Sequence, residues 1–217
     1  MTAPIPPLVF PLGHYVGAFH PDIGAPLKYR KIRIGVEVEQ LPGEELFGVW
    51  ALAHGLPDRV GRVPWTRDSV IAVAGEMGIA KAEDQLEQLI ERHLLAEVTP
   101  GTPQAAEFAR GHRIQPLMLG LGNSPEDPLT FSLGFVGTPP AVKVNSFLYE
   151  LWQWGRVTRS LWLTAEMFAQ VEQKVSPDNR QSSPAGILDR MLQQLHILLA
   201  HNAAYLDAVL EPAQLQD

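Results

Sequence analysis

Apolar residues recur every three or four positions in two stretches between residues 66 and 98, a spacing that places them on one face of a helix. Thr66 can cap the first helix because its hydroxyl can accept a hydrogen bond from an amide of the first turn. Gly78 can end that helix because glycine adopts a positive φ at little cost. A second helix is expected over residues 80–93, and the alternation over 94–98 is typical of a strand. The sequence therefore predicts helix, turn, helix and strand. The apolar faces of the two helices consist of Val70, Ile71, Val73, Ala74, Met77, Ala82, Leu86, Leu89 and Ile90.

Three further patterns precede this stretch. Residues 1–26 are rich in proline and glycine and are expected to form an extended arm without regular structure. Strict alternation over residues 30–39 predicts one half-buried strand, with the even-numbered apolar residues on its buried side. Residues 44–54 then have the periodicity of an amphipathic helix, which Gly55 ends.

The residues after 98 predict a short helix and a hairpin. Thr102 and Pro103 can cap a helix that ends at Gly111. Two apolar strands are expected over residues 114–121 and 129–135, and the segment between them is rich in turn residues. Because the two strands follow each other in the chain, we expect them to pair and to enlarge the sheet beside the preceding helices.

Residues 145–210 look like a second, looser copy of the first set of helices. The aromatic helix 147–155 (FLYELWQWG) matches 47–55 (FGVWALAHG), and Thr164 takes the capping position of Thr66. Two more helices are expected after the aromatic helix of this second copy. The residues expected to face inward from them are Met167, Phe168, Val171, Val175, Ile187, Leu188, Met191, Leu192, Leu195 and Leu199.

The last expected helix leaves two interpretations open. Ser183 followed by Pro184 begins it in the favoured order of cap and then proline, and residues 204–210 follow it as a strand follows the first helix pair. The helix is apolar nearly all round, which also suits burial against another subunit. Residues 145–210 are therefore either a second helical module or a helical dimerisation domain.

The stretch 66–98 resembles the core of bacterial winged helix-turn-helix regulators. Those proteins place an alanine four residues before the turn glycine, here Ala74 and Gly78, and run from a leucine-rich second helix into a short strand, here LEQLIERHLLAEV. The resemblance implies an α+β fold, with tandem winged helix-turn-helix modules, an N-terminal extended arm and strand, and an enlarged β-hairpin wing. The expected domains are an arm over 1–26, a winged-helix domain with its β-hairpin over 27–138, and a helical, winged-helix-like module over 139–217.

Composition limits the classes of function. A net charge of −7 disfavours broad electrostatic attraction to nucleic acid or to anionic membranes. The absence of cysteine excludes disulfides and cysteine-based zinc sites. No apolar run reaches the roughly 20 residues that span a bilayer, and the first residues lack the features of a secretory signal. We therefore expect a cytoplasmic protein that does not insert into membranes.

Motifs for catalysis and for cofactors are also missing from the sequence. It contains no nucleophile elbow, no HExxH, no P-loop and no GxGxxG before a helix. His14, His20 and Asp22 lie close together, but their spacing matches no established metal motif. We expect a protein that is not an enzyme and that uses neither a metal nor a cofactor.

One expected function is that of a DNA-associated, transcription-regulatory protein that binds double-stranded DNA as a homodimer. The exposed side of helix 80–93 is acidic, and Asp84 stands where such regulators usually have an apolar residue. Contacts with phosphates and base edges are therefore expected from the second module and the wing. The candidate nucleic-acid-binding residues are Arg156, Arg159, Arg180, Gln181, Arg190, Arg110 and Arg113.

The alternative function is a protein–protein adaptor that uses winged-helix modules as interaction surfaces. The acidic first module favours it, because clustered carboxylates repel the phosphates of a duplex. The aromatic helix in the second module supplies large side chains of the kind that dominate protein interfaces. The candidate partner-binding residues are Phe147, Trp152 and Trp154.

Overall fold

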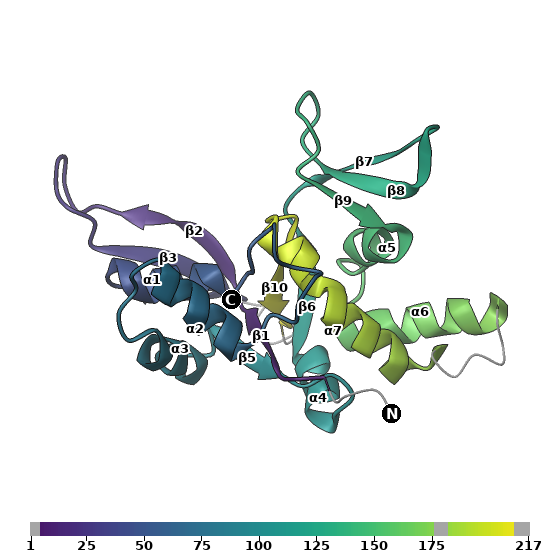
Figure 1. Cartoon of the computed structure of the whole chain (residues 1–217), viewed down its shortest axis with the longest axis horizontal. Coiled ribbons are helices and arrows are strands. Elements are labelled where there is room, and N and C mark those ends of the chain that lie inside the picture. The colour runs from purple at the N-terminus through teal and green to yellow at the C-terminus, as the bar shows by residue number, and fades with distance from the viewer. Residues whose placement is uncertain (1–4, 176–181, 211–217) are drawn as a thin grey trace.

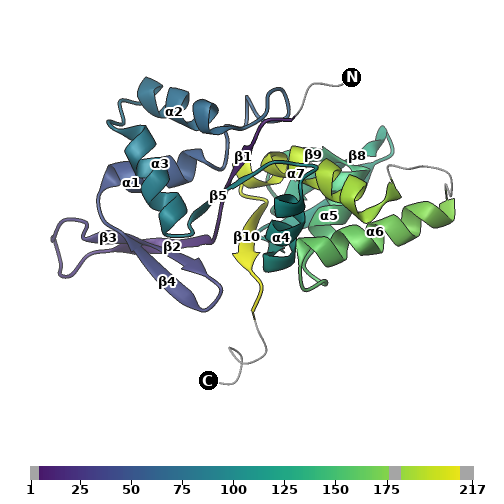
Figure 2. The ribbon, with the colours of Figure 1, turned by 90° about the horizontal axis from the view of Figure 1, so that it is seen from below.

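In the computed structural model, which describes residues 5–175 and 182–210, two groups of elements lie on either side of a two-stranded ribbon (Figures 1 and 2). Strand β1 (Leu8–Pro11) pairs antiparallel with strand β5 (Leu95–Val98) to form this central ribbon. The fold is α+β, with seven helices and several small antiparallel sheets in the described residues. None of these helices combines the length and apolar character needed to cross a bilayer.

Strand β1 of the central ribbon is buried on both of its faces. All four residues of β1 are buried. Val9 belongs to the core of the first group, whereas Leu8 and Phe10 belong to the core of the second. Because successive side chains of a strand point to opposite faces, a consecutive run of apolar residues is what a strand between two cores requires.

The first group contains a three-stranded sheet and three helices. Thr66 caps the second of these helices, its hydroxyl accepting from the amide of Ser69 at 3.4 Å, and Gly78 adopts a φ of 75° in the turn that follows. The helices and the strand predicted over 66–98 are thus present. The elements of the group are β2 (His14–Phe19), β3 (Tyr29–Ile34), β4 (Glu37–Leu41), α1 (Glu44–Leu52), α2 (Arg67–Glu76) and α3 (Ala82–Glu91).

The second group repeats this order of elements. Helix α4 (Pro103–Gly111), capped by Thr102 as predicted, leads from the central ribbon into it. Each group then has a first strand, a meander of three strands and three helices, and a last strand that pairs antiparallel with the first. The elements are β6 (His112–Pro116), β7 (Leu119–Ser124), β8 (Asp127–Gly134), β9 (Val142–Asn145), α5 (Ser146–Trp154), α6 (Leu161–Val175), α7 (Pro184–Ala200) and β10 (Ala204–Ala208).

Two predictions for the N-terminal part were wrong. The segment expected to be an irregular arm contains strands β1 and β2, because its prolines stand at the edges of an apolar run and leave that run intact. The single strand expected over 30–39 is two strands, β3 and β4, joined at Gly35, which has a φ of 58°. Apolar residues continue to alternate with other residues on both sides of Gly35, so the pattern gave no indication of the turn.

The predicted hairpin is confirmed only in part, because Leu119 and Gly120 pair with Gly134 and Leu133 but the first residues of the predicted strand pair elsewhere. Residues 114–121 span parts of two strands, and β6 pairs with β10 from the far end of the chain. Strand β7 pairs with β8, and β8 with β9, which leads directly into α5. The hairpin therefore lies with the second group of helices and does not extend a sheet of the first.

The start of α6 differs from the prediction as well. The helix begins at Leu161, and Thr164 is buried inside it, donating to the carbonyl of Ser160 at 3.1 Å. In contrast, Ser183 caps α7 as predicted by accepting from the amide of Gly186 at 3.2 Å. The six residues of α7 that were expected to face inward are all buried.

A buried carboxylate links the two groups near the end of β10. Asp207 is fully buried and accepts from the amide of Gly35 at 2.7 Å and from Nη2 of Arg113 at 3.1 Å. Arg33 lies 3.9 Å from the same carboxylate and donates to the hydroxyl of Tyr205 at 2.7 Å. The turn between β3 and β4 is thereby tied to the β6–β10 pair.

We expect the substitution Arg113→Ala to lower the free energy of unfolding by about 3 kcal/mol, because it removes the closest cation from a buried carboxylate. The matched control is Arg59→Ala, which breaks the exposed ion pair with Glu76 and should cost much less, because solvent screens that pair. Urea unfolding measures both values. Equal losses in the two variants would contradict the proposed role of Asp207.

Candidate functional site

An apolar groove about 650 Å³ in volume is lined by residues of α5, α6 and α7. These three helices belong to the second group, whose ribbon is shown in Figure 2. Helix α6 packs on α7, and its buried residues are Leu161 and the small residues Thr164, Ala165 and Ala169. Three other apolar residues of the helix, Leu163, Val171 and Val175, are exposed. The residues that line the groove are Ser146, Phe147, Glu150, Trp154, Met167, Phe168, Val171, Glu172 and Arg190.

The outward face of α6 corrects the predicted inward stripe. Val171 and Val175 are 59% and 79% exposed, and Leu163 is 42% exposed on the same helix. With Met167 they form a row in which each residue is four positions after the last, so they share one face. We call Leu163, Met167, Val171 and Val175 the α6 stripe. An exposed apolar row of this length is a feature of interaction sites.

The polar groups at the rim of the groove are paired with one another. Arg190 forms an ion pair with Glu172 and lies 3.9 Å above the ring of Phe147. The indole N–H of Trp154 donates to the carboxylate of Glu150 at 2.7 Å. Because Glu172 balances the charge of Arg190, Glu150 gives the groove a net negative rim.

The predicted partner-binding residues divide between two sides of α5. Phe147 and Trp154 line the groove. Trp152 is half-buried on the other side, with its ring 5.6 Å from that of Tyr149 and against Gly120 of β7. Its indole N–H is buried and has no hydrogen-bond partner among the described residues. Trp152 therefore packs against the three-stranded sheet formed by β7, β8 and β9.

The predicted nucleic-acid-binding residues have different surroundings. Arg113 and Arg190 are each ion-paired, and Arg110 lies 4.4 Å above the ring of Trp162. Arg156 and Arg159 are exposed in the loop between α5 and α6. Arg180 and Gln181 lie outside the described residues.

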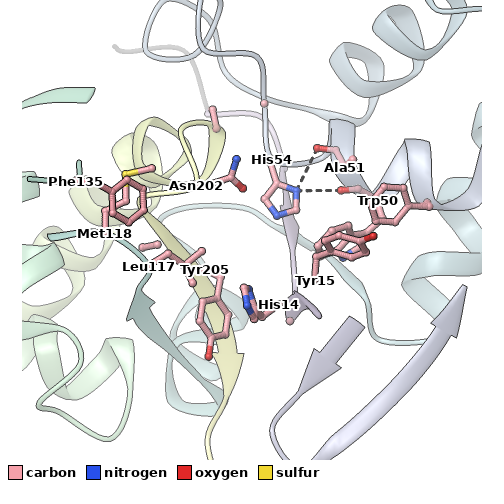
Figure 3. Close-up of a pocket in the computed structure, with 15 residues that line it drawn as sticks. His14, Tyr15, Trp50, Ala51, His54, Leu117, Met118, Phe135, Asn202 and Tyr205 are labelled. Carbon is pink, nitrogen blue, oxygen red and sulfur yellow. Dashed lines mark hydrogen bonds between the residues drawn. The ribbon is translucent and has the colours of Figure 1, made fainter. Parts of the chain in front are cut away.

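A second hollow, about 490 Å³ in volume, lies between the two groups of elements and is called the inter-group cleft below (Figure 3). One wall is aromatic: Tyr15 lies 5.0 Å from Phe47, and Trp50 lies 4.6 Å from His54, between ring centroids. The opposite wall comes from the second group. It consists of Leu117, Met118, Phe135, Asn202 and Tyr205.

His54 lines this cleft, and both it and His196 of α7 are held neutral by burial. The Nδ1 of His54 donates to the carbonyls of Trp50 and Ala51 at 3.2 and 3.1 Å, and burial lowers its pKa to about 4. His196 of α7 donates through Nε2 to the carbonyl of Val9 at 2.8 Å, and burial lowers its pKa also to about 4. His196 thus connects α7 to the central ribbon. Among the described residues, no group of histidines and carboxylates is arranged to hold a metal ion.

Most residues of both hollows were missed by sequence analysis. Met167, Phe168 and Val171 were assigned to a core, since three-to-four spacing does not say which face of a helix is buried. The signal that marks the buried face of α6 is its set of small residues, Thr164, Ala165 and Ala169, on the side opposite Met167 and Val171. The inter-group cleft had no local signal at all, because its walls come from segments that lie far apart in the sequence, at 13–15, 47–55, 117–135 and 200–205.

Comparisons with known proteins returned no relatives: the chain matches no protein-family model, no curated protein and no solved structure. The site is therefore interpreted from its own geometry.

We expect the free energy of unfolding to fall as the pH falls from about 6.5 to about 4. His196 has a pKa of about 4 when folded and about 6.5 when unfolded, so the unfolded chain binds more protons in this window. The loss from His196 should be about 2.5 kcal/mol between pH 7 and pH 4.5.

Urea unfolding of the variant His196→Gln at the same two pH values isolates this contribution. Glutamine can still donate to the carbonyl of Val9 but does not titrate. The variant should therefore lose about 2.5 kcal/mol less than the unmodified protein over this interval. Identical losses in the two proteins would show that His196 is not neutral in the fold.

Proposed function

We propose that the protein is a non-catalytic adaptor that binds an amphipathic, basic helix of a partner protein in the groove between α5, α6 and α7. The observation that carries this proposal is the α6 stripe, in which Leu163, Val171 and Val175 are exposed and Met167 is half-buried at the groove. Burying apolar surface is the main driving force of association. An exposed row of this kind is therefore best explained by a partner.

A helix is the occupant that fits the shape of the stripe. The stripe runs from Leu163 to Val175, which are twelve helical steps apart, so its length is about 18 Å. A partner helix lying beside it would bury residues at positions i, i+3, i+4 and i+7, the usual mode of helix recognition in an apolar groove. Phe147 and Trp154 at the other wall are large aromatic anchors of the type found at the centre of interfaces.

Charge favours a basic partner. Among the described residues that line the groove, Glu150 and Glu172 are acidic and Arg190 is the one cation, and the whole chain has a net charge of −7. Lysine or arginine residues flanking the apolar face of the partner helix would be attracted to this rim and would speed association.

The same geometry gives DNA binding less support. A duplex requires cations that can reach phosphates. Two of the predicted arginines are already ion-paired with carboxylates, and a third is stacked on a tryptophan. The order of α1, α2, α3 and β5 nevertheless supports a relationship to winged-helix proteins. We propose that each group is a variant of that fold in which an upstream strand pairs with the strand after the third helix.

We expect a synthetic peptide of about 18 leucine and lysine residues, with leucine at helical spacing, to bind at least tenfold more tightly than a scrambled peptide of the same composition. The scrambled peptide has the same charge but no apolar face, so it measures electrostatic attraction alone. Titration calorimetry of the full chain gives both dissociation constants.

Two variants with the same change in charge locate the site. Val171→Glu places a carboxylate in the groove, and Leu129→Glu places one on β8, where Leu129 is 81% exposed and outside the groove. Val171→Glu should weaken binding of the amphipathic peptide at least tenfold, whereas Leu129→Glu should change it less than twofold. Equal or tighter binding by Val171→Glu would contradict the proposal, because it would show that attraction to negative charge alone causes the binding.

The same experiments also test two other possible occupants of the groove, a second copy of the chain and duplex DNA. If the protein is a dimer that Val171→Glu converts to a monomer, the groove is an interface between copies of the chain and the adaptor proposal fails. If duplex DNA binds at low salt and the peptide does not, the adaptor proposal also fails. Analytical ultracentrifugation and a DNA titration distinguish these two results.

A further inference from the structure

The inter-group cleft has the size and the lining of a small-molecule site. Its volume of about 490 Å³ lies within the range of about 300–1,000 Å³ that is usual for ligand pockets. Both groups of elements contribute to its walls, as Figure 3 shows. The position between two rigid units is one at which ligand sites are often found.

The cleft contains one hydrogen-bond acceptor whose state is fixed by the fold. The carbonyls of Trp50 and Ala51 can only accept, so the Nδ1 of His54 must carry the proton. Its Nε2 is then a lone-pair acceptor, and Figure 3 shows this nitrogen directed into the cleft. Because burial lowers the pKa of His54 to about 4, the ring stays neutral at physiological pH.

The other walls favour a flat and uncharged molecule. Aromatic rings of Tyr15, Phe47 and Trp50 cover one side, and Met118 and Phe135 face them from the other group. Such walls stack on a planar ring system. Burial and the nearby charge of Arg33 also lower the pKa of His14, which favours its neutral form.

We propose that the inter-group cleft binds a neutral, planar heteroaromatic molecule, whose N–H group donates a hydrogen bond to Nε2 of His54. Asn202, at the edge of the cleft beside His54, presents an amide that can pair with a second polar atom of the ligand. This site is separate from the groove between α5, α6 and α7, so the proposal does not depend on the adaptor function.

Indole and 1-methylindole are matched probes for this site. The two molecules have nearly the same shape, but only indole has an N–H group. Indole should bind with a dissociation constant near 1 mM or below, as expected for a ligand of this size. Binding of 1-methylindole should be about five- to tenfold weaker because it leaves His54 without a donor. Backbone amide chemical shifts of the full chain, followed during titration, give both constants and the residues affected.

Substitution at an exposed position tests the location without disturbing the core. Ala51 is exposed on α1 and lines the cleft, so Ala51→Trp should fill the cleft and abolish indole binding. Ala185, exposed in the first turn of α7 and outside the cleft, provides the control Ala185→Trp, which should leave indole binding unchanged.

Three results would overturn the proposal. These are no shift with indole at its solubility limit, equal affinity for the two probes, or full binding by Ala51→Trp. None of them bears on peptide binding in the groove.

Discussion

The burial of β1 on both faces is the constraint on which the rest of the structure depends. Val9 and Phe10 are fully buried neighbours that enter different cores. A strand in this position must be apolar at consecutive residues and must have its backbone groups satisfied within the protein. The pairing with β5 meets the second requirement, and the carbonyl of Trp65 and the imidazole of His196 add bonds to the amide and the carbonyl of Val9. Neither group of elements is therefore complete without the central ribbon.

The repeat of elements relates the two hollows to each other. Phe47, Trp50 and His54 of the first group line the inter-group cleft, and Phe147, Glu150 and Trp154, at the matching positions of the second group, line the groove. The same face of the aromatic helix thus serves both sites. In the first group that face is covered in part by the second group and forms a cleft. In the second group nothing described in the structure covers it, and it forms an open groove.

Local signals in the sequence predicted local structure well. Thr66, Gly78, Thr102 and Ser183 mark helix ends because a cap or a positive φ depends on only a few neighbouring residues. The α+β class and the helices over 66–98 followed from such signals. The repetition of helices also had a visible basis in the match between 47–55 and 147–155.

Features that depend on distant residues were not predictable in this way. The partners of β1 and β6 lie far away in the chain, so alternation could not reveal the pairings β1–β5 and β6–β10. The orientation of α6 depended on whether Ala165 and Ala169 or Met167 and Val171 met α7. Ala165 and Ala169 are the buried residues, because small side chains allow two helices to pack closely. Met167 and Val171 are therefore left to line the groove.

Native-state hydrogen exchange of the variant Phe10→Ala tests the central claim most directly. Phe10 faces only the second core, and its loss should cost about 3–5 kcal/mol. If the central ribbon joins both groups into one cooperative unit, the most protected amides of α1 and α3 should lose as much protection as those of α7. Loss of protection in α7 with no change in α1 and α3 would contradict the account, because the two groups would then unfold independently.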